Sequence, residues 1–418
     1  MAEFAPVISR FVGTIRSLRS TLPLVASTVQ EAEGKAKRAF ASYLEKHSVE
    51  KEPQEDGTTN YTLPAEHAVR IRELAARTER TAIATQILPR TFIVSLVSEY
   101  DAYLGDLVRV LYNKQPALID SSEKQFAFSE IAAFPTIEDL RSSVIDKEVD
   151  TLLRESHADQ IEWLERQLGL ILTRDLKIWP DFIEITERRN LFVHTGGKVT
   201  AQYITNCNRH AVLLSEEVKI GEFLTVEPEY FVHACDVILE VGVKLAHVLW
   251  RKIAAGERAE ADTMLNVTCY NLIHVNEFPL AIELLTFATE TIRKHSSEEI
   301  YLYMRLNKAQ AHKWSAQITE CNSILDEIDW TAKSPKFRMV RLALRDEFDD
   351  AASLMQTIGP NGEVSLADYY DWPVFREFRR SDQFKSALRE VFGVEFQLME
   401  SAPTAPSNEE ESPARNGA

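Results

Sequence analysis

The stretch that decides the fold of this 418-residue chain is residues 229–254, which read EYFVHACDVILEVGVKLAHVLWRKIA. Its apolar residues recur at three- and four-residue steps and mark one inner face: Phe231, Val232, Cys235, Val237, Ile238, Val241, Leu245 and Leu249. This period is typical of an amphipathic helix whose apolar face is buried. The stretch therefore predicts the closing helix of a helical bundle.

The segments before it show the same helical period. We expect two long helices in residues 65–114, separated near Leu88-Pro89, because a proline interrupts helical hydrogen bonding. Residues 136–172 predict two more helices, with Thr136 as an N-cap. A further helix is expected at 179–194, ended by Gly196-Gly197. With only 14 Gly and 16 Pro in the chain, the fold class is predicted to be all-α.

The N-terminal residues precede the bundle in the chain. Residues 3–48 predict one or two helices with a single apolar stripe, which packs either on the bundle or on a partner. Residues 49–60 are polar and carry Pro and Gly, so they are interpreted as a linker.

After residues 255–261 the pattern changes to short paired helices, with a unit of about 34 residues. Phe278-x-x-Ala281 and Phe348-x-x-Ala351 occupy matching positions. These pairs resemble degenerate tetratricopeptide repeats, which implies an α-solenoid of helical hairpins. The predicted organisation is an N-terminal segment and linker (1–60), a bundle (61–255), repeats with a C-terminal cap (256–397) and a disordered tail (398–418).

Charge and cysteine usage narrow the function classes. The formal net charge of −17 argues against a broad basic surface for duplex DNA, but not against a small cationic pocket. The four cysteines are far apart and lack CxxC spacing, so neither a zinc site nor any other metal or cofactor is expected. We find no signal peptide and no apolar run of about 18 residues, which predicts a cytoplasmic protein without membrane contact.

One run carries the candidate chemistry: residues 187–196, ERRNLFVHTG. It places Arg189, Asn190 and His194 at the end of the expected helix, just before Gly196-Gly197. A fixed cation, an amide and a base that titrates near neutral pH together suit phosphodiester chemistry. These three residues are the predicted catalytic residues, and Glu99, in the apolar helix of 92–111, is a candidate auxiliary acid beside Tyr100 and Asp101.

Helix geometry raises an objection to this site. Residues five apart point about 140° away from each other on a regular helix. Arg189 and His194 would share a site only if the helix end is distorted or a second copy contributes. The alternative is structural: Arg189 pairs with Glu184 or Glu187, and His194 merely caps the helix C-terminus. His210 shows no ligand-like spacing and is interpreted as a satisfied polar residue.

The run Arg189-Asn190-Leu191-Phe192-Val193-His194 resembles the R-x4-H motif of the HEPN superfamily, over about residues 85–255. The resemblance implies an all-helical, HEPN-like bundle and a metal-independent endoribonuclease, typically a dimer whose two motifs face each other. Other members of the superfamily are binding or scaffold modules.

The sequence therefore leaves two alternative functions. The first is an RNA-cleaving toxin or antiviral-defence effector, with a shared active site in a homodimer and a protein regulator or antitoxin on the repeats. The second is a non-enzymatic dimerising adaptor that binds a protein partner through the repeats.

Overall fold

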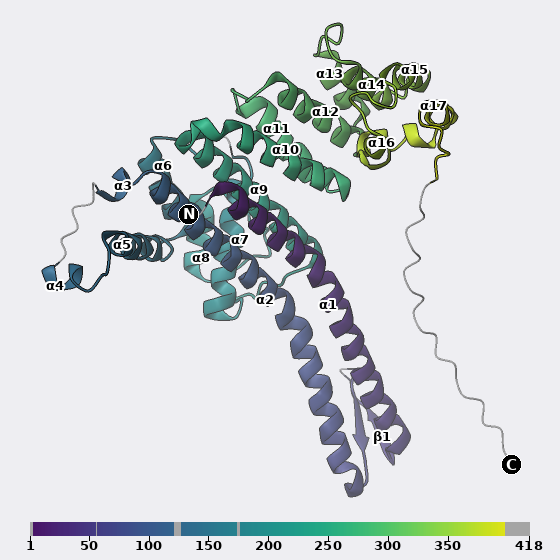
Figure 1. The fold of residues 1–418 in the computed structure, drawn as a ribbon. Helices are drawn as coiled ribbons and strands as arrows, with labels where there is room; N and C mark the ends of the chain where they lie inside the picture. Colours follow the sequence, from purple (N-terminus) through teal and green to yellow (C-terminus); the bar gives the residue numbers. More distant parts are fainter. Residues whose placement is uncertain (1–2, 56, 121–126, 174–175, 398–418) are drawn as a thin grey trace. The chain divides into compact units, whose positions relative to one another are not determined.

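The computed structural model describes residues 3–55, 57–120, 127–173 and 176–397. Helices form nearly all of the regular structure in these residues, and their only sheet is a two-stranded antiparallel hairpin (Figure 1). The all-α prediction is confirmed. The tail expected at 398–418 lies outside the described residues.

The chain divides into two compact units. The first comprises the residues through Cys269 together with Glu283–Tyr301, and the second comprises Tyr270–Ile282 and the residues from Leu302 onward. The division thus runs through the first predicted helical hairpin rather than between residues 255 and 256.

Four long helices form the bundle of the first unit. They are α1 (Phe4–His47), α2 (Ala68–Lys114), α7 (Trp179–Thr195) and α9 (Pro228–Ile253). α9 packs against the other three, and its apolar residues, among them Val237, Ile238 and Val241, are buried. The helix predicted at 229–254 and its buried inner face are both confirmed.

The N-terminal helix α1 belongs to this bundle. The Phe11 ring stacks on Tyr103 of α2 with 3.8 Å between centroids, and Phe4 stacks on Trp250 of α9 at 5.4 Å. α9 carries Gly242 where Phe11 crosses it, and a Cβ there would lie 2.4 Å from the Phe11 ring. A side chain at this position would collide with the ring, so the glycine permits the close approach. The apolar stripe of residues 3–48 therefore packs on the chain's own bundle.

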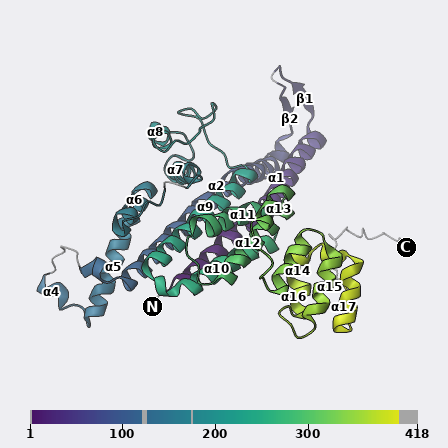
Figure 2. The ribbon, with the colours of Figure 1, turned by 90° about the horizontal axis from the view of Figure 1, so that it is seen from above.

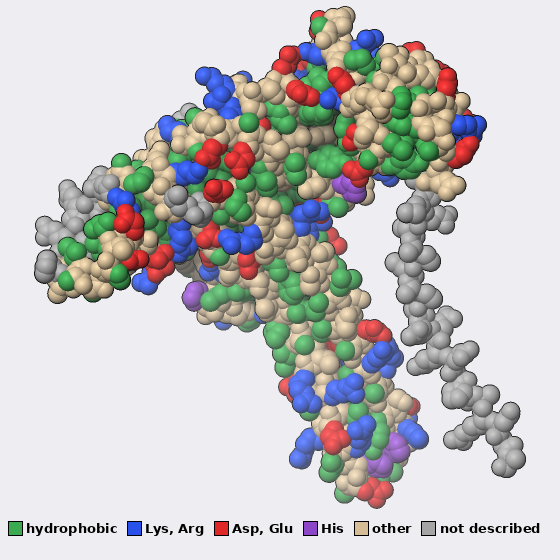
Figure 3. Space-filling model, viewed as in Figure 1, with side chains coloured by type: hydrophobic (Ala, Val, Ile, Leu, Met, Phe, Trp, Pro, Cys, Tyr) green, Lys and Arg blue, Asp and Glu red, His purple; other side chains and the backbone are tan. Residues whose placement is uncertain are grey.

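The far halves of α1 and α2 extend beyond the core as a paired arm, which both views show side by side (Figures 1 and 2). Beyond Leu22 only Ala36 of α1 is buried, and before Ile93 only Leu74 of α2 is buried. Charged side chains of both signs lie on the arm, together with hydrophobic and other side chains (Figure 3).

The predicted break near Leu88-Pro89 was wrong, since α2 runs continuously through Pro89. An interior proline costs a helix about 3 kcal/mol, because it removes one hydrogen bond and crowds the preceding turn. Here α2 is held by α1 along the arm and by α9 in the core, and these contacts outweigh the local cost.

The linker expected at 49–60 was also wrong. Its residues form most of a hairpin of β1 (Glu50–Pro53) and β2 (Thr59–Thr62), with Glu50 opposite Thr62. Gly57 adopts a φ of 83° in the turn, so the glycine that suggested a flexible break instead closes the hairpin.

Shorter helices and single turns connect the long helices of the first unit. Thr136 caps α5, as predicted, and the structure adds a capping box to Asp139; Ser156 caps α6. The remaining helices of this region are α3 (Ala117–Asp120), α4 (Phe128–Ile131), α5 (Ile137–Leu152), α6 (His157–Leu168) and α8 (Ala201–Arg209), with η1 (Ala65–His67) and η2 (Ala255–Glu257) as single turns.

The later part of the chain has the short paired helices that the sequence predicts. They are α10 (Arg258–His274), α11 (Phe278–Thr286) with the π-helical turn η3 (Phe287–Thr291), α12 (Glu298–Trp314), α13 (Ile318–Asp326), α14 (Pro335–Leu344), α15 (Phe348–Ile358), α16 (Leu366–Asp371), η4 (Pro373–Phe375), η5 (Phe378–Arg380) and α17 (Asp382–Phe392). The small residue Ala351 is fully buried in the core of the second unit. The likeness to tetratricopeptide repeats stays a prediction.

Among the residues that the structure describes, one helical stretch, Ala65–Lys114, is long and apolar enough to cross a membrane by length and composition alone. A core helix that meets this test is mostly buried, whereas only 17% of the qualifying 18-residue window of this stretch is buried.

Candidate functional site

The candidate residues lie on α7, whose ends are set by local sequence. Pro180 stands in the first turn, where its missing N–H costs nothing, and Asp181 beside it suits the positive end of the helix. Gly196 ends the helix with a left-handed φ of 63°. The glycine stop is confirmed, and it places His194 in the last helical turn.

Arg189 is held by contacts from two sides. Its Nη2 donates to Oδ2 of Asp101 on α2 at 2.5 Å, and its Nη1 donates to Oδ1 of Asn190 at 3.2 Å. The other carboxylate oxygen of Asp101 lies 2.8 Å from Nε2 of His157, at the start of α6. Asp101 therefore joins three helices and fixes the guanidinium group of Arg189.

A cavity of about 480 Å³ brings the three predicted residues together. Arg189, Asn190 and His194 all border this space, which we call the motif cavity. Because it touches α7 from Glu187 to Thr195, the cavity follows the last two turns of the helix. The 140° offset therefore does not keep Arg189 and His194 from bordering a common cavity of one chain.

The alternative role expected for Arg189 was an ion pair with Glu184 or Glu187. Neither pair is present among the described residues. Oε1 of Glu184 accepts instead from Arg188 at 2.7 Å, and Oε2 of Glu187 accepts from Asn206 at 2.9 Å. His194 is exposed, and no hydrogen bond or ion pair of its ring is recorded in the described part of the chain. The imidazole is thus free to meet a ligand.

A buried network behind α7 holds the neighbouring elements in place. Glu184 accepts hydrogen bonds from the hydroxyls of Tyr203 on α8 and Tyr230 on α9, each at 2.6 Å. Burial, followed by the charge of Glu184, raises the pKa of both tyrosines. Burial alone would lower the pKa of Arg188, but Tyr230, Glu184 and Tyr203 raise it overall. Arg188 is therefore a fixed cation of the scaffold, although it adjoins Arg189.

The candidate acid Glu99 is exposed, and no ion pair joins it to Arg189 among the described residues. Asp101, two residues further on, makes that contact. Residues two apart point to nearly opposite sides of a helix, so the rotation of α2 decides which acid faces the motif. His157 gave no signal in the sequence, because its spacing from Asp101 and Arg189 fits no local pattern.

Comparisons with protein-family models, curated proteins and solved structures found no match for this chain. Within the described residues, no group of three or more His, Cys, Asp or Glu side chains has the arrangement of a metal site.

We expect Asp101→Asn to lower the free energy of unfolding by about 1–3 kcal/mol, because Arg189 and His157 would lose a shared, largely buried partner. Asp146→Asn is the matched control, since Asp146 pairs with Arg109 at a far more exposed position and should cost less than about 1 kcal/mol. Urea unfolding followed by circular dichroism measures both. Equal, small losses would show that Asp101 does not hold the three helices together.

Proposed function

We propose that this chain is a HEPN-type endoribonuclease that cleaves RNA through attack of a ribose 2′-OH, without a metal ion. The observation that carries the proposal is that Arg189, Asn190 and His194 border one cavity of a single chain. The cation is held in place, while the imidazole is exposed and uncommitted. This is the division of roles that phosphodiester cleavage requires.

In the proposed reaction the 2′-oxygen forms a bond to phosphorus and the bond to the 5′-oxygen breaks. Neutral His194 accepts the 2′-OH proton, and the resulting imidazolium returns a proton to the leaving 5′-oxygen. Arg189 binds the phosphate and stabilises the charge that develops on it. Asn190 steadies Arg189 through its 3.2 Å contact. The products are a 2′,3′-cyclic phosphate and a 5′-hydroxyl.

The wider role that we propose is a cytoplasmic toxin or antiviral-defence effector, active as a homodimer and controlled by a protein regulator or antitoxin on its helical repeats. A concave repeat surface suits such control. The competing proposal is a dimerising adaptor without activity, which the net charge of −17 favours because it opposes RNA binding.

The product ends test this proposal directly. We expect the full-length chain to cut single-stranded RNA in the presence of EDTA and to leave 2′,3′-cyclic phosphate and 5′-hydroxyl ends, which mass spectrometry identifies. RNA that is 2′-O-methylated throughout, and DNA of the same sequence, should remain intact because both lack the attacking hydroxyl. Cleavage of the DNA, or ends that carry a 5′-phosphate, would rule out the proposed chemistry.

A further inference from the structure

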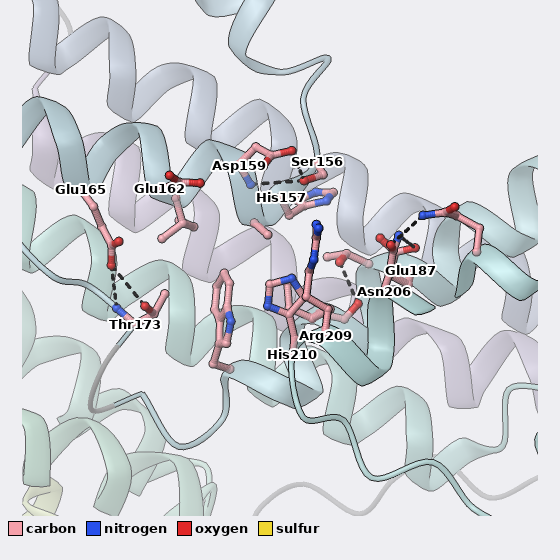
Figure 4. Close-up of a pocket in the computed structure, with 16 residues that line it drawn as sticks. Ser156, His157, Asp159, Glu162, Glu165, Thr173, Glu187, Asn206, Arg209 and His210 are labelled. Atoms are coloured by element: carbon pink, nitrogen blue, oxygen red, sulfur yellow. Dashed lines mark hydrogen bonds between the residues drawn. The ribbon is translucent and has the colours of Figure 1, made fainter. Parts of the chain in front are cut away.

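A second histidine, His157, borders the motif cavity together with Arg189 and His194. It is the first residue of α6, and its side chain is only 9% exposed. Figure 4 shows it beside Ser156, on the wall of a neighbouring cavity of about 660 Å³. The reaction proposed above gives this imidazole no role, although it is a group able to carry a proton at the edge of the site.

The ring of His157 is held in one orientation by three neighbours. Its Nε2 lies 2.8 Å from Oδ1 of Asp101. The rings of Tyr100 and Phe182 lie against it, with centroids 6.0 and 5.9 Å away. An imidazole that a carboxylate orients in this way is arranged for proton transfer, as is the histidine of a Ser-His-Asp triad.

The contact with Asp101 also decides which ring nitrogen can meet a ligand. An ionised carboxylate only accepts hydrogen bonds, so Nε2 of His157 carries a hydrogen. Nδ1 makes no hydrogen bond in the described part of the chain and is not sealed inside the protein. Because the ring borders the motif cavity, Nδ1 is the nitrogen that a substrate there can reach.

The same carboxylate keeps His157 close to the arginine that would bind phosphate. Oδ2 of Asp101 accepts from Nη2 of Arg189 at 2.5 Å, while Oδ1 holds His157. The guanidinium group and the imidazole are thus fixed on the two oxygens of one side chain. A phosphate that Arg189 binds is therefore presented next to His157.

Cleavage by a 2′-OH requires two proton transfers on opposite sides of the phosphorus atom. The attacking 2′-oxygen and the leaving 5′-oxygen lie roughly in line through it. An imidazole placed at the attacking oxygen would have to move before it could reach the leaving oxygen. The exposed ring of His194 and the fixed ring of His157 supply two imidazoles to one cavity.

We propose that His157 is a further catalytic residue, the general acid of the cleavage. This proposal rests on the proposed RNA cleavage and reassigns only the second of its two proton transfers. Neutral His194 takes the 2′-OH proton while the bond from the 2′-oxygen to phosphorus forms. Protonated His157 gives its Nδ1 proton to the 5′-oxygen while the bond from phosphorus to that oxygen breaks. Asp101 stabilises the imidazolium before the transfer, and proton exchange with water restores both rings afterwards.

A leaving group that needs no proton tests this role. The probes are two single-stranded RNAs with one cleavable linkage each, all other riboses being 2′-O-methylated. One keeps the 5′-oxygen at the cleavable linkage, and the other carries a 5′-sulfur, which departs as a thiolate. Single-turnover rates are measured with the full-length chain. We expect His157→Gln to slow cleavage of the oxygen substrate roughly 10²–10⁴-fold and of the sulfur substrate less than about threefold.

The choice of variants separates proton transfer from scaffolding. The amide of His157→Gln still offers Asp101 a hydrogen-bond donor. His233→Gln is the matched control, because Nε2 of His233 also pairs with a carboxylate, Asp181 at 3.1 Å, but does not border the motif cavity. It should change neither rate. His194→Ala should slow both substrates, since both need the 2′-OH proton removed. If circular dichroism shows that His157→Gln is unfolded, His157→Asn takes its place with the same expected pattern.

The outcomes distinguish this role from the proposed function. Suppose that the wild type cuts the oxygen substrate, but His157→Gln slows both substrates equally or slows neither. The acid role is then overturned and the nuclease stands. No cleavage of either substrate by the wild type overturns the nuclease, and the acid role with it.

Discussion

Replacement of His194 by alanine is expected to slow RNA cleavage by roughly 10²–10⁴-fold, the usual contribution of a positioned acid–base group. His194 is exposed in the last turn of α7 and borders the motif cavity, so its loss removes the proton carrier and little else. Single-turnover cleavage of a labelled RNA measures the rate. Thermal unfolding of the variant should match that of the wild type.

Arg189 provides the complementary variant. Arg189→Lys keeps a positive charge but loses the planar group that contacts Asp101 and Asn190 together. We expect a loss of about 10²–10³-fold in rate, comparable to the loss of one oxyanion donor. His233→Ala is the matched control for His194→Ala, since His233 is an exposed histidine of the same bundle and does not border the motif cavity.

Rates within twofold of wild type for both His194→Ala and Arg189→Lys would show that the motif takes no part in RNA cleavage. Expression in cells gives a second measure, because a toxic ribonuclease arrests growth and these variants should not. If the wild type and both variants are equally harmless and equally inactive on RNA, the adaptor proposal is favoured.

Replacement of Phe11 by alanine is expected to lower the free energy of unfolding by about 3–5 kcal/mol. The ring is buried, stacks on Tyr103 at 3.8 Å and fills the gap that Gly242 leaves on α9. Its removal would leave a cavity at the junction of three helices, which neighbouring side chains cannot fill without a backbone shift.

Leu24→Ala is the control for this prediction, because Leu24 lies on the same helix with 71% of its surface exposed. It should change stability by less than about 0.5 kcal/mol. Urea unfolding compares both variants with the wild type. Equal midpoints for Phe11→Ala and Leu24→Ala would mean that α1 contributes no more to the bundle at Phe11 than it does on the arm.

The features that the sequence predicted correctly depend on nearby residues. α9 follows from its apolar period, the α5 start from Thr136 and Asp139, and the α7 end from Gly196. In each case the signal and the structure lie within a few turns of one another, so local propensity and packing favour the same conformation.

The errors arose where distant contacts decide the outcome. Pro89 predicts a break by itself, but the pairing of α2 with α1 keeps the helix whole. The choice between Glu99 and Asp101 depends on the rotation of α2 about its own axis, which no short stretch of sequence reveals. The same holds for His157, which reaches Arg189 only through Asp101.

The stacking of Phe4 on Trp250 has a consequence for synthesis of the chain. The ribosome makes α1 before α9, and the partner ring on α9 emerges only after most of the bundle has been translated. At about 5–20 residues per second, the apolar stripe of α1 waits on the order of 10–50 s for that partner. During this interval the nascent chain presents a hydrophobic helix, which is the kind of surface that chaperones bind. The stacking of Phe4 on Trp250 can thus form only late in synthesis of the bundle.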